Sequence, residues 1–123
     1  MSEMKKGNII QEKTFSFACD IVILVRKISS SSRYNVVCRQ LLKSGTSIGA
    51  NVEEAIGAQS TKDFFTKLTI AYKEARETAY WLKLMKNTCS IDLMTANKLL
   101  DKVEEILRII GAIQKTIKLK KNS

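Results

Sequence analysis

Carboxylates and thiols are the side chains with which this chain could do acid–base or nucleophilic chemistry, because it contains no histidine. That absence removes the commonest general base and the commonest metal ligand. It also removes the Glu-x-x-His set with which four-helix bundles hold paired metal ions. The neighbouring pairs Glu53–Glu54 and Glu104–Glu105 would point about 100° apart on a helix, so neither forms a paired acid and base. We therefore expect no catalytic activity, no metal site and no cofactor.

The three thiols, Cys19, Cys38 and Cys89, are odd in number and far apart, with no C-x-x-C pair. This spacing favours neither a zinc site nor a disulfide framework, and free cysteines are usually small buried residues. Residues 1–11 have charges but no long apolar run, so they do not resemble a secretory signal. No segment approaches the ~18 consecutive apolar residues of a membrane span. These features predict a soluble, cytoplasmic protein with reduced thiols.

The segment Ser44-Gly-Thr-Ser-Ile-Gly49 could bind phosphate, form a loop or lie within a helix. A phosphate loop is not favoured, because no Gly-Lys-Ser/Thr ending follows and no G-x-G-x-x-G is present. A glycine-rich loop between two short helices remains open, because each glycine within a helix costs about 1 kcal/mol against alanine. A continuous helix over residues 33–58 is favoured, since the apolar period stays in phase on both sides. Gly45 and Gly49 would then lie one turn apart and let another backbone approach closely. The apolar residues in phase are Val37, Leu41, Ile48, Val52 and Ala55.

Four helical stretches are expected, over residues 13–29, 33–58, 61–86 and 92–116, with Ser60 as the N-cap of the third. Short polar turns between long helices predict an all-α, antiparallel up-and-down four-helix bundle. The bundle should span residues 13–117, with a flexible N-terminal segment (1–12) and a basic C-terminal tail (118–123). The core stripe of the first helix is expected at Phe15, Ala18, Val22 and Val25, and it is thickened by Phe17, Ile21, Leu24 and Ile28. The core stripe of the third helix is expected at Phe64, Leu68, Ala71, Ala75, Ala79 and Leu82. The core stripe of the fourth helix is expected at Leu93, Ala96, Leu100, Val103, Leu107, Ile110 and Ile117, and it is broadened by Leu99, Ile106 and Ile113.

The formal net charge is +9, of which residues 112–123 carry +4. Such a balance attracts polyanions, chiefly nucleic acids or anionic membrane surfaces. A solubilising surface with a lysine-rich tail is the alternative. The candidate nucleic-acid contacts are Arg33, Arg39 and Lys43 on the outer side of the second helix, and Lys115, Lys118, Lys120 and Lys121 near the C-terminus.

An outward-facing apolar group is expected on the third helix, opposite its core stripe. It consists of Ile70, Tyr80, Trp81 and Leu84, interspersed with Lys73 and Glu77. Outward aromatic and aliphatic groups usually mark an interface, so self-association is favoured. Stacking on unpaired bases and burial by the N-terminal segment are the alternatives.

Two segments, Leu41–Ala55 and Lys73–Leu82, resemble the bacterial 23S rRNA intervening-sequence protein family, and the similarity extends over about residues 13–117. The family is similar in fold to the accessory variability protein of diversity-generating retroelements, which binds nucleic acid and its reverse transcriptase. The resemblance implies a four-helix bundle, a ring-shaped pentamer, an RNA or DNA partner and no catalysis. It also suggests a partly buried salt bridge between Glu54 and Arg76. The family motif maps onto Ser44, Gly45, Gly49, Asn51, Glu54, Arg76 and Glu77.

The leading interpretation is an oligomeric, basic nucleic-acid-binding module of low sequence specificity. The alternative is an adaptor that recruits a nucleic-acid enzyme, such as a reverse transcriptase or nuclease, without binding nucleic acid itself. Attachment to a membrane surface is less favoured. It would use Ile113, Ile117 and Leu119, and the two isoleucines are already needed to complete the core stripe of the fourth helix.

Overall fold

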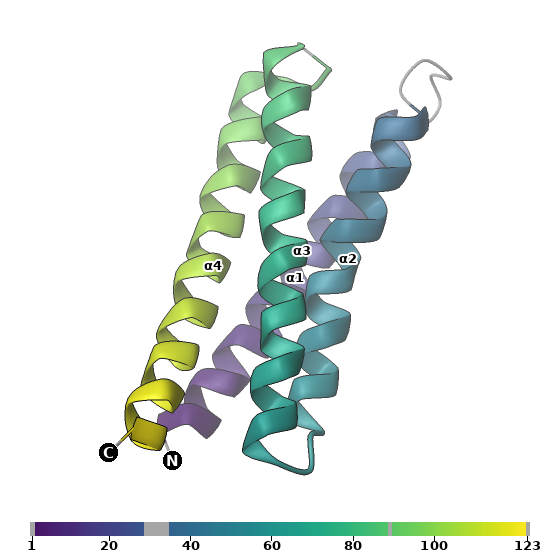
Figure 1. Ribbon diagram of the computed structural model, residues 1–123. Helices are drawn as coiled ribbons and strands as arrows, with labels where there is room; N and C mark the ends of the chain where they lie inside the picture. The colour runs from purple at the N-terminus through teal and green to yellow at the C-terminus, as the bar shows by residue number, and fades with distance from the viewer. Residues whose placement is uncertain (1, 29–34, 89, 123) are drawn as a thin grey trace.

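The computed structural model describes residues 2–28, 35–88 and 90–122, with the backbone alone described for residues 2–8, 35 and 122. Over these residues the chain forms four helices: α1 (Ser2–Ile28), α2 (Asn35–Ile56), α3 (Thr61–Asn87) and α4 (Leu93–Asn122). They run alternately up and down, and both termini lie at the same end of the bundle (Figure 1). The predicted all-α four-helix bundle is confirmed.

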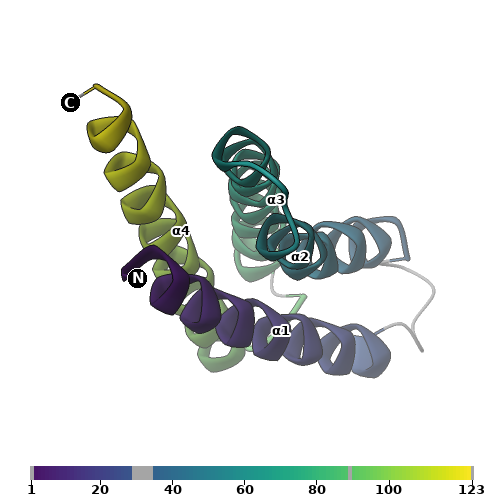
Figure 2. The ribbon, with the colours of Figure 1, turned by 90° about the horizontal axis from the view of Figure 1, so that it is seen from below.

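Each helix packs against two neighbours, so that α1 and α3 occupy one diagonal of the bundle and α2 and α4 the other (Figure 2). The pair α2–α3 is the most extensively packed, and α1–α4 the least. The two seams of α4 therefore differ, since one joins it to α3 and the other to the more loosely packed α1.

The first helix departs from its prediction in its start and in its buried face. It begins at Ser2 instead of near Lys13, and Ile10 is fully buried in the core, so the bundle extends into the segment predicted to be flexible. Phe15 is 69% exposed and Val22 is 37% exposed, so the predicted primary stripe is wrong at these two positions, although Val25 is buried as predicted. The core is made instead by the residues expected only to thicken that stripe, together with Ile10: Ile10, Phe17, Ile21 and Leu24, with Val25 at the edge.

The second helix is continuous through its two glycines, as predicted, and the glycines explain how closely α1 approaches. A Cβ on Gly49 would lie 3.3 Å from the backbone oxygen of Thr14, and a Cβ on Gly45 would lie 3.0 Å from two carbons of Ile21. The absent side chains therefore make room for α1. The apolar arc Leu41, Ile48, Val52 and Ala55 is buried.

A buried polar contact joins α2 to α3. The Thr78 hydroxyl donates to the Ser44 hydroxyl over 3.0 Å, and both residues are fully buried. The Thr78 oxygen also lies 2.8 Å from the Glu74 carbonyl, so its single proton is shared between two acceptors and the hydroxyl is satisfied without water. This contact fixes the register of the two antiparallel helices, because a buried hydroxyl without a partner would be costly.

The remaining helices begin and end near their predicted positions. Ser60 caps α3, accepting a hydrogen bond from the Asp63 N–H over 3.0 Å, as expected. Its predicted core stripe is confirmed, with Phe64 half-buried at the edge. In α4 the stripe is also confirmed except at Leu93, which is 61% exposed because it begins the helix beyond the packed region. The last helix continues to Asn122, so Lys118–Lys121 extend α4 as helix instead of forming a tail.

Candidate nucleic-acid interface

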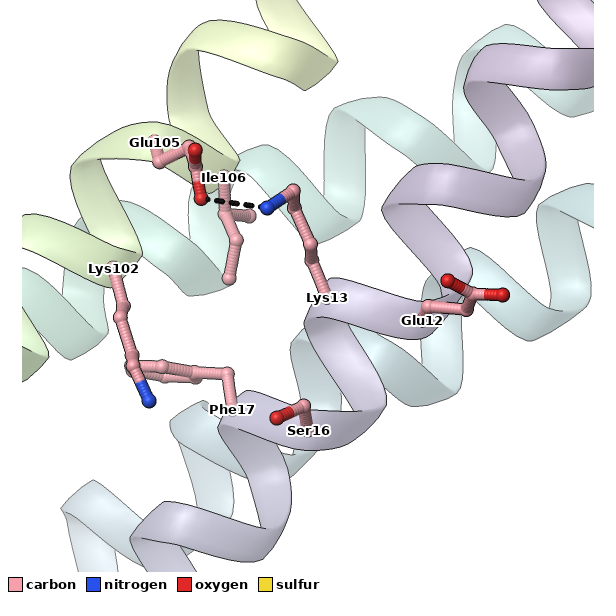
Figure 3. A pocket seen from close by; sticks show the side chains of 7 residues that line it. All are labelled: Glu12, Lys13, Ser16, Phe17, Lys102, Glu105 and Ile106. Carbon is pink, nitrogen blue, oxygen red and sulfur yellow. Dashed lines mark hydrogen bonds and ion pairs between the residues drawn. The ribbon is translucent and has the colours of Figure 1, made fainter.

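The seam between α1 and α4 uses its charges in pairs. Lys13 bonds to Glu105 over 3.0 Å, and Lys102 bonds to Asp20 over 2.6 Å. The four side chains are 32–46% exposed. A cavity of about 270 Å³ opens beside these pairs (Figure 3). Its lining is Glu12, Lys13, Ser16, Phe17, Lys102, Glu105 and Ile106. Since each lysine that lines the cavity is neutralised by a carboxylate, this seam offers little attraction to a polyanion.

The seam between α2 and α3 corrects the predicted salt bridge. Glu54 pairs with Lys67 over 2.9 Å, not with Arg76. The register explains the difference: Thr78 lies opposite Ser44, so Arg76 is level with the middle of α2, about two turns away from Glu54 near the end of that helix. Arg76 is exposed and forms no ion pair with any residue that the structure describes.

Two of the cations predicted on α2 are exposed, and one of them, Lys43, lies near an acid of α3. Arg39 and Lys43 both face solvent. Burial raises the pKa of the Glu74 carboxyl and the neighbouring Glu77 raises it further, while Lys43 acts in the opposite direction. Lys43 therefore lies close enough to α3 to be partly neutralised by its acids. Arg33 falls outside the described residues.

The predicted C-terminal lysines, Lys115, Lys118, Lys120 and Lys121, are exposed on the last turns of α4. Cations there are favoured by the negative end of the helix dipole. Lys118 lies over the ring of Phe65 on α3, 5.6 Å from its centroid. The structure keeps these lysines apart from Arg39 and Lys43, since α2 and α4 lie at opposite corners of the bundle (Figure 2).

The seam between α3 and α4 carries basic residues that sequence reasoning did not connect. Gln114 donates to the Thr69 hydroxyl over 2.7 Å, which sets the register of this antiparallel pair. Arg76 and Arg108 are exposed on its two helices. A signal was present in the sequence, since α4 has no acidic residue after Glu105, but their proximity depends on a register that only the structure supplies.

The group predicted to mark an oligomer interface faces outward only in part. Ile70 and Tyr80 are 38% and 58% exposed, whereas Trp81 and Leu84 are half-buried. Trp81 packs against the core, and its indole N–H donates to Glu77 over 3.1 Å. Its ring meets that of Tyr80 edge-on at 5.0 Å. Tyr80 and Ile70 are therefore the exposed apolar contacts on this face.

A second exposed apolar group lies on α1 and was not expected. Phe15, Val22 and Ile23 are 69%, 37% and 48% exposed, and Cys19 lies exposed among them. The signal that could have revealed it is the presence of two apolar stripes on one helix, of which only one can face the core. Since α1 and α3 are diagonal neighbours, the bundle presents exposed apolar side chains on two opposite sides.

The remaining chemical groups follow the sequence expectations in part. Cys38 is buried, and burial raises the pKa of its thiol. Cys19 is exposed, which corrects its assignment to the core, and Cys89 lies outside the described residues. Within the described ranges, no cluster of three or more Cys, Asp or Glu could hold a metal ion. In the same part of the chain, no helix is long and apolar enough to cross a membrane.

Comparison with known proteins adds a family and a structural relative. The family model described as 23S rRNA-intervening sequence protein matches residues 6–112. A crystal structure from Bacteroides thetaiotaomicron VPI-5482, described as a protein with unknown function from the S23 ribosomal protein family, superimposes with a TM-score of 0.86 at 41% sequence identity. The match covers 89% of this chain and 98% of that chain. No curated protein matches the sequence.

Proposed function

Because this chain belongs to the 23S rRNA-intervening sequence protein family, we propose that it is a non-catalytic module that binds RNA or DNA. Binding would rest mainly on charge, with low sequence specificity, and would take place in the bacterial cytoplasm. The observation that carries the proposal is the uneven use of charge: acids neutralise cations on the α1–α4 seam, whereas several cations elsewhere stay unpaired. A net charge of +9 then remains available to a polyanion.

The test is fluorescence anisotropy of the wild-type protein with a structured RNA and with duplex DNA, at salt concentrations from about 50 to 300 mM. Counterion release predicts binding that falls steeply with salt and varies little between unrelated sequences. An absence of binding to either nucleic acid at the lowest salt concentration would contradict the proposal. It would favour instead an adaptor that recruits an enzyme such as a reverse transcriptase or nuclease.

Self-association is part of the same proposal. Helices α1 and α3, which carry the exposed apolar residues, lie diagonally across the bundle from each other (Figure 2). If one surface packs on the other, the contact is head-to-tail, and such contacts generate rings when they close. This arrangement agrees with the ring-shaped pentamer that the family resemblance implies. Similarity in fold to the retroelement accessory protein likewise remains an expectation.

Sedimentation velocity tests the association directly. We expect the wild type to sediment as an oligomer at tens of micromolar protein. Tyr80→Glu and Phe15→Glu should each shift it toward monomer, because a desolvated charge opposes burial of these surfaces. Glu12→Gln, on the exposed part of α1, is a matched surface control that should leave the distribution unchanged. A monomeric wild type would contradict the self-association proposal.

A further inference from the structure

The register of α3 against α4 can be followed from three successive contacts. Lys118 lies over the Phe65 ring, Gln114 bonds to Thr69, and the position of a Cβ on Gly111 is 4.0 Å from the Tyr72 ring. Each step of three or four residues forward on α3 thus matches a step of three or four residues back on α4. The next step of four residues in this antiparallel series brings Arg76 on α3 level with Leu107 on α4, the residue next to Arg108.

Arg76 and Arg108 therefore lie within one residue of the same level on the two helices, and both are exposed. Neither residue forms a hydrogen bond or ion pair with any described side chain. Lys115 continues the same row of α4 between Gly111 and Lys118, and it too is exposed and unpaired. Like charges on opposing rows repel one another, so this arrangement gains free energy when an anion lies between them.

The basic row has a defined end. Toward the other end of the same seam, Asp101 and Glu104 line a cavity of about 580 Å³ together with Lys83 and Lys86. The unpaired cations begin one turn beyond Glu104, at Arg108, and α4 carries no acid from there to its last residue. From Arg108 to Lys118 the row is about 15 Å long, which matches about four phosphates of one strand at 3.4 Å rise.

The aromatic residues of this seam do not offer a stacking surface for bases. Phe65 and Tyr72 are half-buried, and the face of Phe65 is already occupied by Lys118. Gly111 places no side chain between the helices, and a Cβ there would meet only the Tyr72 ring at 4.0 Å, so a phosphate backbone could approach both helices. The chemistry of the seam therefore suits phosphate oxygens, not unstacked bases.

From these observations we propose that the nucleic acid binds across the α3–α4 seam, with the phosphate backbone of one duplex strand lying between Arg76 and the row Arg108, Lys115 and Lys118. The inference rests on the proposed nucleic-acid-binding function and assigns it a place. It moves the main contact away from Arg39 and Lys43, which lie on another helix, where Lys43 is close to the acid Glu74.

The experiment compares the wild type with the triple variant Arg76→Gln/Arg108→Gln/Lys115→Gln and with the matched variant Arg39→Gln/Lys43→Gln. Anisotropy is measured with duplex RNA, duplex DNA and a single strand across the same salt range. The triple variant should lose at least about ten-fold in affinity, and its salt slope should flatten by about two to three, since each phosphate contact contributes about 0.9. The α2 variant should stay within about two-fold of wild type, and duplexes should bind at least as tightly as the single strand.

The possible results distinguish an error in the location of the binding site from an error in the proposed nucleic-acid-binding function. In one case the wild type binds and the triple variant binds equally well; in another, the α2 variant loses more affinity than the triple variant. Either result would contradict binding at the α3–α4 seam and leave the proposed function intact. Tighter binding of the single strand would overturn the phosphate-backbone mode. If the wild type does not bind at the lowest salt concentration, the function itself fails.

Folding of the variants is checked by circular dichroism melts. The three replaced side chains are exposed and unpaired, so the triple variant should melt close to wild type. Arg76→Lys/Arg108→Lys keeps both charges and should retain most of the salt slope. Loss of that slope in the lysine variant would contradict a contact made by charge.

Discussion

The two seams of α4 use the same residue types in opposite ways. Toward α1, Lys102 and Glu105 each meet an opposite charge on the facing helix. Toward α3, Arg108 and Lys115 form no ion pair with a described residue, and Arg76 on α3 lies within one residue of the level of Arg108. Charges on the first seam are used within the bundle, whereas those on the second remain available to a partner.

The comparison shows that net charge alone does not locate a binding surface. The four cations nearest the C-terminus and those on α2 are prominent in the sequence, but a cation contributes to binding only where the fold leaves it unpaired. Pairing depends on helix register, and register is set by packing and by contacts such as Ser44–Thr78.

The largest expected change in stability comes from the close packing of α1 on α2, and it should exceed the effect of any ion pair. Gly49→Leu should destabilise the protein by about 2 to 3 kcal/mol, because its side chain would meet the backbone of Thr14. Gly111→Ala is the matched control: its Cβ has only the Tyr72 ring at 4.0 Å, so it should gain up to about 1 kcal/mol. Chemical denaturation measures both. A Gly49→Leu protein as stable as wild type would show that α1 does not rely on close approach at α2.

Double-mutant cycles sharpen the contrast between paired and unpaired charges. Lys102→Met with Asp20→Asn should give a coupling energy of about 0.5–1 kcal/mol, as expected for a partly exposed ion pair. Glu54→Gln with Arg76→Met should give none, whereas Glu54→Gln with Lys67→Met should give a measurable value. A coupling between Glu54 and Arg76 would contradict the register described for α2 and α3.

Charge reversal tests the two halves of the α3–α4 seam. Arg76→Glu should stabilise the free protein by about 0.5 kcal/mol, because it places an acid within one residue of the level of Arg108. Lys83→Glu should destabilise by a similar amount, since Asp101 and Glu104 line the cavity beside it. Thermal melts at low and high salt measure both effects, which should shrink as salt screens them. If both substitutions changed stability in the same direction, the two halves of the seam would not differ in charge as described.

The smallest effect concerns Glu74 on the α2 side of α3. Because its pKa is raised in the folded state by burial and by Glu77, its charged form is disfavoured there. The penalty on folding grows as pH rises from the unfolded-state pKa and is complete above the folded-state pKa. Glu74→Gln should therefore be slightly more stable than wild type at neutral pH, by less than about 1 kcal/mol for so exposed a group. The difference should vanish when pH falls below the unfolded-state pKa. A variant that is less stable at neutral pH would contradict the stated origin of the shift.

Sequence periodicity predicted the helices well where one helix has one apolar stripe. In α2, residues in phase on both sides of Gly45 and Gly49 correctly predicted a continuous helix. In α1, Phe15 and Val22 form one stripe and Phe17 and Ile21 another, and period alone could not decide which faces the core. The predicted start of α1 is too late because the residues before Ile10 are mostly polar and show no apolar period. The burial of Ile10 therefore could not be inferred from the pattern.

The candidate interface could be predicted less well, for a physical reason. Spacing within one helix identifies which residues share a face, so Lys115 and Lys118 were found. Contacts between helices depend on register, which the sequence does not encode locally. For this reason Glu54 was assigned the wrong partner, and the opposition of Arg76 and Arg108 was missed.

Arginine side-chain signals provide the most direct measurement of where nucleic acid binds. The chain has five arginines, and four of them, Arg26, Arg39, Arg76 and Arg108, lie one on each helix. In an NMR titration with duplex RNA at low salt, the Nε–Hε signals of Arg76 and Arg108 should shift together and saturate together. Those of Arg26 and Arg39 should change little. Shifts confined to Arg26 or Arg39, with Arg76 and Arg108 unmoved, would contradict the α3–α4 interface.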